Sequence, residues 1–172
     1  MSKAVHASSG AVAILLIMSA LLIVGFAQEA PAILGASELT HVVPSGFYFE
    51  GQSGPTQVRN SAAARLAANS RVIAGLVDTS GYSSEVKGKY EGFLITDSPI
   101  SVEGFELVTG AYGFGFSSEG KLNIFDISGK PVLSVAAHKD DGLKRPKPLM
   151  MTVNAPGVRL YTGRLYVTLA LK

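Results

Sequence analysis

The sequence predicts a mainly β fold, an antiparallel β-sandwich or a barrel-like sheet of about eight to ten short strands with one short helix. From residue 46 onward, short apolar or alternating stretches are separated by clusters of Gly, Pro, Asn, Asp and Ser, a pattern typical of strands and turns. The strands recur about every ten residues, the spacing that all-β domains show. We therefore expect a single β-sandwich domain over residues 46–172.

The clearest strands lie in the segment 110–137. Tyr112, Phe114 and Phe116 alternate with small residues, which places the three rings on one face of a strand. Two Gly-containing turns then reverse the chain, so the segment predicts a three-stranded antiparallel meander. Large apolar side chains usually fill the core, and we expect the three rings to do so.

Shorter patterns predict the remaining strands. The aromatic stretch 46–50 reads as a strand that ends at the turn-rich residues 51–55, and two short extended pieces flank Gly104. The continuous apolar run 71–77 predicts a strand that is buried on both faces. Further strands are expected over residues 90–96, 149–153, 158–161 and 165–171.

The one predicted helix covers residues 61–68, which read SAAARLAA, because Ala and Arg have high helix propensity. Asn60 or Ser61 can cap its start, and Asn69 can end it. At about two turns, such a helix depends on packing for its stability. Residues 28–45 show no clear period and predict an extended lead-in to the sandwich.

The N-terminus has the features of an export signal. Lys3 precedes an uncharged apolar run over residues 11–26, and small residues precede a cleavage site after Ala27. We therefore expect residues 1–27 to be a cleaved signal peptide and the protein to be periplasmic or extracellular. The alternative is an N-terminal membrane anchor, because no charged residue occurs between Lys3 and Glu29. The strongly apolar part is shorter than the ~20 residues of a usual span, which favours cleavage.

Composition excludes several classes of function. The chain has 15 Lys and Arg against 13 Asp and Glu, a net charge of +2, which is too small for the basic surface of a nucleic-acid-binding protein. It has no Cys, so disulfides, thiol nucleophiles and Cys-bound metals are excluded. An exported chain without disulfides favours a bacterial origin. We expect no cofactor and no metal.

Motifs that resemble catalytic sites are incomplete. The segment 115–122 follows the phosphate-binding loop pattern but ends in Leu where the mechanism needs a hydroxyl. Two Ser-x-x-Lys motifs, at 84–87 and 118–121, lack the Lys-Thr-Gly that such acylating enzymes require. His41 and His138 are the remaining candidates for a general base, and Asp140 and Asp141 follow His138 in a polar loop that we expect to be a solvated turn. Any two of four carboxylates on or beside strands could approach as a glycosidase pair; these are Glu50, Glu91, Glu103 and Glu106.

Two polar loops are the expected places for a binding surface, since loops on a rigid sandwich usually carry function. They are residues 78–89 and residues 139–148. Tyr82 in the first loop, with Lys144 and Arg145 in the second, are the residues best suited to contact a partner. The basic cluster 144–147, which reads KRPK, could also touch an anionic surface, although nearby acidic residues favour a solvated loop.

The segment 108–114, which reads VTGAYGF, resembles the Leu/Val-x-x-Gly-x-Tyr strand entry of uncharacterised secreted bacterial β-sandwich proteins. The resemblance covers about 30 residues around the meander. It implies a β-sandwich fold and export, and it implies no activity and no site residues.

These observations favour an exported, non-catalytic β-sandwich that binds another protein or an envelope component, or that has a structural role in the envelope or extracellular matrix. A second hypothesis is a carrier of a small apolar ligand, held in a β cavity lined by the aromatic stripe and the strand at 72–77. The third is a hydrolase that uses His41 or His138 with nearby carboxylates.

Overall fold

The computed structural model describes residues 30–172. The predicted signal peptide or anchor, residues 1–27, lies outside the described residues. Within residues 30–172, no helix has the length and apolar character needed to cross a membrane.

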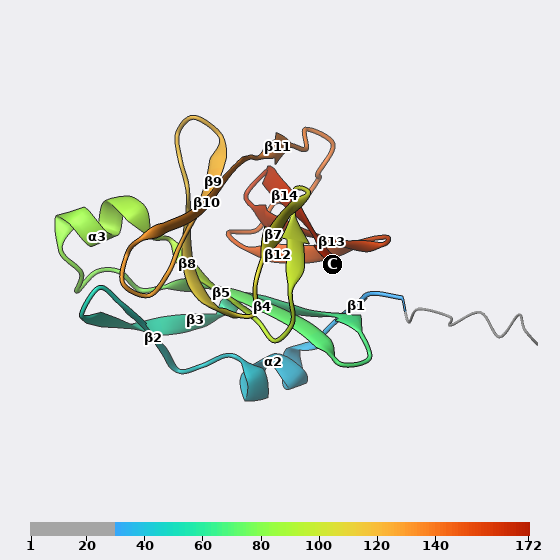
Figure 1. Cartoon of the computed structure of the whole chain (residues 1–172), viewed down its shortest axis with the longest axis horizontal. Helices are drawn as coiled ribbons and strands as arrows, with labels where there is room; N and C mark the ends of the chain where they lie inside the picture. Colours follow the sequence, from blue (N-terminus) through green and yellow to red (C-terminus); the bar gives the residue numbers. More distant parts are fainter. Residues whose placement is uncertain (1–29) are drawn as a thin grey trace, which may run out of the picture.

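The described chain forms two antiparallel sheets (Figure 1). The first has eight strands, in the order β1-β3-β4-β5-β8-β9-β10, with β2 paired to β3. Its strands are β1 (Ala32–Ile33), β2 (Gly46–Phe49), β3 (Gln52–Ala67), β4 (Ser70–Val77), β5 (Gly92–Thr96), β8 (Gly110–Phe116), β9 (Lys121–Phe125) and β10 (Pro131–Ala136).

The second sheet has six strands, in the order β12-β13-β14-β6-β7, with β11 paired to β14. Its strands are β6 (Ile100–Val102), β7 (Phe105–Leu107), β11 (His138–Lys139), β12 (Met150–Asn154), β13 (Gly157–Thr162) and β14 (Leu165–Leu171). The sheets do not close into a barrel, so the mainly β, sandwich-like prediction is confirmed. There are more strands than expected because several are pairings of two or three residues.

The main core lies between the two sheets. Val72 and Ala74 of β4 and Tyr112 and Phe114 of β8 face it from the first sheet, and strands β6, β12, β13 and β14 face it from the second. Phe116 packs against the same cluster from a partly buried position. The predicted meander over β8, β9 and β10 and the packing of its three rings in the core are confirmed.

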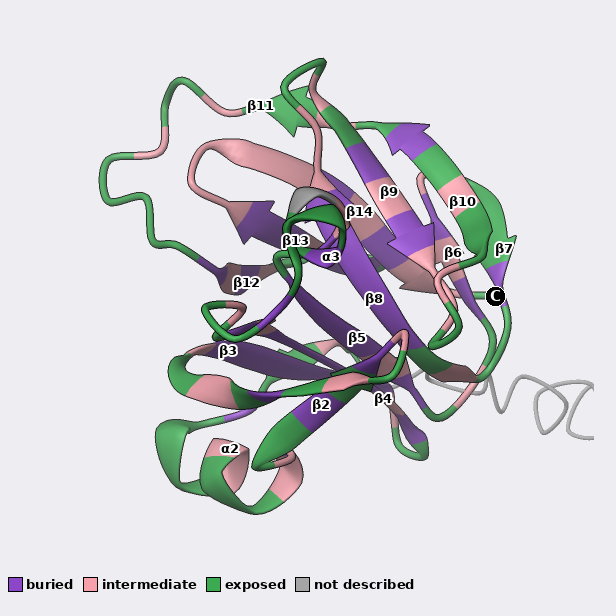
Figure 2. Ribbon diagram, turned by 90° about the vertical axis from the view of Figure 1, so that its left-hand side faces the viewer, coloured by how far each residue is buried: buried purple, intermediate pink, exposed green. Residues whose placement is uncertain are grey.

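A second core covers the opposite face of the eight-stranded sheet. Ile73 and Phe93 of this sheet pack under β2 and under the helices α2 (Ala36–Val42) and α3 (Ser84–Lys89). The strands β4, β5 and β8 are therefore largely buried, while α2 stays on the outside with no buried residue (Figure 2). The strand predicted at 71–77 is indeed buried on both faces, because successive residues of β4 contribute to different cores.

The predicted helix at 61–68 is wrong, because residues 61–67 belong to the strand β3. Ala62 and Ala64 face the main core while Ala63, fully buried, faces the second. β3 also pairs with β1 on one side and β4 on the other. Small side chains fit a strand covered on both faces, and these tertiary contacts override the intrinsic helix propensity of a segment too short to be stable alone.

Helices occur instead in two segments that were predicted to be extended or irregular. The lead-in 28–45 contains α2, whose first turn is fixed by Glu38, which accepts a hydrogen bond from the Gly35 N–H at 3.0 Å. The polar loop 78–89 contains α3, where the Ser83 hydroxyl accepts from the Val86 N–H at 3.4 Å. Both are single short helices held by local capping and by the second core.

Candidate functional site

The two loops predicted to carry function border the same pocket. A pocket of about 540 Å³ is lined by Thr79 and Lys87 from the first loop and by Pro148 at the end of the second. Glu91, just before β5, and Thr162, at the end of β13, line it as well. We call this the inter-loop pocket.

Backbone hydrogen bonds hold the walls of the inter-loop pocket. The Gly163 N–H, in the turn between β13 and β14, donates to the Lys147 carbonyl at 3.0 Å, which fixes the end of the second loop. Across the pocket, the Glu91 N–H donates to the Phe114 carbonyl at 2.8 Å, and the Glu91 carbonyl accepts from Val77 at 3.1 Å. Glu91 is therefore placed by two neighbouring strands rather than by a mobile loop.

Glu91 is the perturbed acid of this pocket. Its side chain is reached by solvent, yet the surrounding walls remove part of the water from the carboxyl. This desolvation raises the pKa of Glu91 above the ordinary 4.5, and a backbone hydrogen bond from Phe116 opposes the shift. No Lys, Arg or His among residues 30–172 lies within ion-pair distance of this carboxyl.

One residue that lines the pocket has a side-chain oxygen without a hydrogen-bond partner among the described residues. The Thr162 hydroxyl oxygen is buried and has no hydrogen-bond partner within the described chain. Buried polar atoms are nearly always satisfied in folded proteins. Thr162 therefore lines the inter-loop pocket together with Glu91, the acceptor, and Lys87, a donor.

The three residues predicted to contact a partner lie elsewhere. Tyr82 is buried, with 5% of its surface exposed, and its hydroxyl donates to the Phe47 carbonyl at 3.1 Å. It therefore belongs to the second core and not to the surface of its loop. Burying the large apolar ring beside β2 stabilises the fold more than leaving it exposed to solvent would. Lys144 and Arg145 are exposed on the second loop but do not line the pocket.

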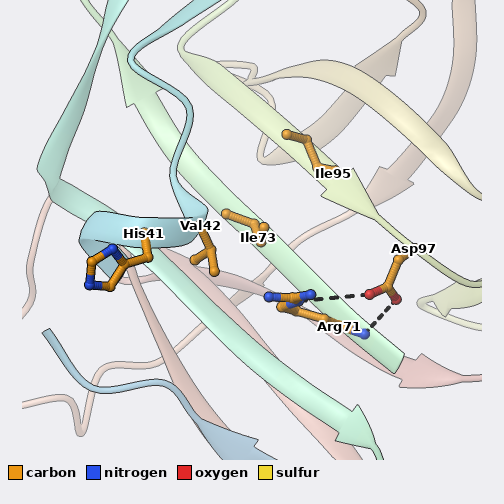
Figure 3. Close-up of a pocket in the computed structure, with 6 residues that line it drawn as sticks. All are labelled: His41, Val42, Arg71, Ile73, Ile95 and Asp97. Carbon is orange, nitrogen blue, oxygen red and sulfur yellow. Dashed lines mark hydrogen bonds and ion pairs between the residues drawn. The ribbon is translucent and has the colours of Figure 1, made fainter. Parts of the chain in front are cut away.

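The two histidines are far apart in the fold. His41 lies in α2 and lines a pocket of about 300 Å³ between this helix and the ends of β4 and β5. Its ring points away from Asp97, which is instead paired with Arg71 (Figure 3). His138, on β11, places Nε2 at 3.0 Å from a Glu103 oxygen.

The four carboxylates considered as a glycosidase pair have four different surroundings. Glu50 binds Lys89 and Tyr90, Glu103 binds His138, Glu106 binds Lys172, and Glu91 lines the inter-loop pocket. Among residues 30–172, no group of three or more His, Asp or Glu is arranged to hold a metal ion. The use of a histidine in hydrolysis stays a prediction.

Comparison of the chain with models of protein families, with curated proteins and with solved structures gave no match.

Proposed function

We propose that the protein is an exported, non-catalytic β-sandwich that binds a small polar molecule in the inter-loop pocket. The observation that carries this proposal is the partly desolvated, unpaired carboxylate of Glu91 in a pocket bordered by two loops. A concave site with a few converging polar groups and one perturbed acid is typical of ligand binding. Export rests on the N-terminal sequence, and cleavage after Ala27 would remove none of the described strands.

The lining of the pocket indicates the chemistry of the ligand. The Glu91 carboxylate offers hydrogen-bond acceptors, so a ligand with an ammonium or hydroxyl group would restore the interactions that Glu91 loses with water. Lys87 offers a donor for an acceptor group on the same ligand, while Leu76 and Pro148 supply apolar contact. This mixed lining supports a polar organic molecule more than the purely apolar ligand of the carrier hypothesis.

Native mass spectrometry of the protein from the exported fraction tests the proposal. We expect extra mass in the native spectrum that is absent after denaturation, together with a denatured mass that corresponds to cleavage after Ala27. Glu91→Gln keeps the shape of the side chain but removes its charge, and it should reduce ligand occupancy about tenfold if the ligand is an amine.

Glu119→Gln is the matched control, because Glu119 lies in the exposed turn between β8 and β9, where it pairs with Lys121. Its occupancy should equal that of the wild type. A protein without bound mass, or equal loss in both variants, would contradict binding in the inter-loop pocket. A denatured mass that retains residues 1–27 would instead contradict cleavage and support the membrane anchor.

A further inference from the structure

Two arginines lie directly opposite each other at the end of the β3–β4 hairpin. Arg65 pairs with Arg71 in the register of the two strands. Their neighbours Ala63 and Ile73 belong to the second core, so both arginines lie on the same outer face of the eight-stranded sheet as α2. With Asn69 they form what we call the arginine corner.

The arginine corner borders two pockets. One, of about 370 Å³, is lined by Arg65, Ala68, Asn69, Arg71 and Asp97. The other is the 300 Å³ pocket beside α2, which shares Arg71 and Asp97 with the first (Figure 3). Neither pocket shares a lining residue with the inter-loop pocket.

The carboxylates near the corner leave much of its donor capacity unused. Like charges directly opposite on neighbouring strands are destabilising. Arg65 is paired with Glu38 at 2.7 Å through one nitrogen. Arg71 Nε is 3.7 Å from the Asp97 Oδ2 atom, too far for a hydrogen bond, and Asp97 Oδ1 instead accepts from the Arg71 backbone N–H at 2.6 Å.

Exposure makes these donors accessible to a ligand. The arginine side chains are 52% and 43% exposed, and each guanidinium carries five N–H donors in a planar fork that suits tetrahedral and planar oxyanions. The Asn69 side chain adds an amide donor to the wall of the same pocket.

From this arrangement we infer that the arginine corner binds an anion of the phosphate class between Arg65 and Arg71. The anion would reduce the repulsion between the two opposed guanidinium groups, and its oxygens would accept hydrogen bonds from the N–H groups that do not bind Glu38 or Asp97. The same chemistry is presented by free phosphate and by the phosphate of a lipid headgroup. This inference does not depend on the function proposed for the inter-loop pocket.

Titration with inorganic phosphate, followed by NMR chemical shifts of the arginine side chains and of the Asn69 amide, tests the site. We expect saturable shifts confined to the corner. Arg71→Gln and Arg65→Gln should each weaken binding about tenfold. Co-sedimentation with phosphatidylglycerol and phosphatidylcholine vesicles then separates the sources, since only a lipid-headgroup site would favour the anionic vesicles.

A charge-matched control distinguishes a specific anion site from non-specific electrostatic attraction between phosphate and the protein surface. The double variant Lys144→Gln/Arg145→Gln removes the same two charges from an exposed loop, and it should bind as the wild type does. Asp97→Asn keeps an oxygen for the Arg71 N–H but removes a competing charge, so it should bind phosphate about threefold more tightly. A merely structural Arg71–Asp97 pair would give no such gain.

Three outcomes would overturn the inference. The first is no saturable shift together with no preference for anionic vesicles. The second is an equal loss of phosphate binding in the double variants Arg65→Gln/Arg71→Gln and Lys144→Gln/Arg145→Gln, and the third is weaker binding in Asp97→Asn. Thermal unfolding of each variant shows whether it is folded. If Arg65→Gln loosens α2 by breaking the pair with Glu38, Arg71→Gln still tests the site, since Arg71 pairs with Asp97 and not with Glu38.

Discussion

Two hairpins of this protein make the same turn with the same two residues. Glu50-Gly51 joins β2 to β3, and Glu103-Gly104 joins β6 to β7. Both glutamates have positive φ angles, 43° and 49°, and each is followed by a glycine at 82° or 88°. Two positive φ angles define the type I′ loop, which usually takes Asn before Gly because few other residues adopt this conformation without strain.

The Glu50 hairpin is anchored in the second core. Phe49 is fully buried, and its ring stacks on Tyr90 with centroids 3.9 Å apart. The ring occupies the space that a side chain at Gly113 would need. Glu50 then accepts hydrogen bonds from Lys89 at 3.1 Å and from the Tyr90 hydroxyl at 2.8 Å, which ties the hairpin to the end of α3.

The Glu103 hairpin completes the edge of a sheet. β6 and β11 pair with the same edge of β14 and leave a gap between them at Thr168. Glu103 fills this gap, because its N–H donates to the Thr168 carbonyl at 3.0 Å and its carboxylate accepts from the Thr168 N–H. Phe105 beside it is 60% exposed. The same turn therefore serves two purposes, which are set by its flanking ring and by the target of its carboxylate.

The largest expected difference between the hairpins lies in their aromatic residues. Phe49→Ala should lower the free energy of unfolding by about 4 kcal/mol, because it opens a cavity in the second core. Phe105→Ala should change it by less than about 0.5 kcal/mol, as for other exposed positions. Urea denaturation of the two variants measures both values. Similar losses of unfolding free energy would show that Phe105 of the Glu103 hairpin is buried in solution.

A smaller, pH-dependent difference is expected at Glu50. Hydrogen bonds from Lys89 and Tyr90 lower the pKa of Glu50 below its ordinary 4.5. The ionised form is thus favoured in the folded state, so its stabilisation is present above pH 4.5 and is lost as the pH falls through the lowered pKa. Glu50→Gln should lower the free energy of unfolding by about 2 kcal/mol at pH 7, because the substitution removes the charge-assisted hydrogen bonds.

Denaturation at pH 7 and at pH 3 measures this dependence. The difference in free energy of unfolding between wild type and Glu50→Gln should be smaller at pH 3 than at pH 7. For Glu119→Gln the difference should be small at both pH values. If the difference for Glu50→Gln is the same at both pH values, the shape of the side chain, and not its charge, holds the hairpin on α3.

Local patterns in the sequence predicted one of these hairpins more completely than the other. Two extended pieces around Gly104 were expected and are present as β6 and β7. The residues 51–55 were expected to be a turn, but Gln52 to Pro55 pair with β2. This strand position has to be glycine, because a Cβ atom at Gly54 would lie 2.6 Å from the Asp78 carbonyl oxygen. That requirement comes from a segment distant in sequence and has no local signal.

The same limit applies to the candidate sites. Alternation of polar and apolar residues predicted the strands and identified the two loops that border the inter-loop pocket. It could not separate Glu91 from the other strand carboxylates, because desolvation depends on which segments surround the side chain. The arginine corner was missed because residues 61–68 were read as a helix, and the pairing of Arg65 with Arg71 exists only in a strand.

The smallest effect is expected at Glu103. A substitution there separates the contribution of the turn conformation from that of the hydrogen bonds to Thr168. Asn is the preferred residue at this position of a type I′ turn, so Glu103→Asn would be neutral or stabilising if the turn alone mattered. We instead expect a loss of about 1.5 kcal/mol, because the shorter side chain leaves the Thr168 N–H without an acceptor. His138→Ala removes the other carboxylate contact, at an exposed histidine, and should cost less than half as much. Urea denaturation at pH 7 compares the two variants, with amide hydrogen exchange at Thr168 as a local readout that should be faster in Glu103→Asn only. Unchanged exchange at Thr168 would mean that the gap between β6 and β11 is closed without the carboxylate, and the two Glu-Gly hairpins would then differ only in their aromatic residues.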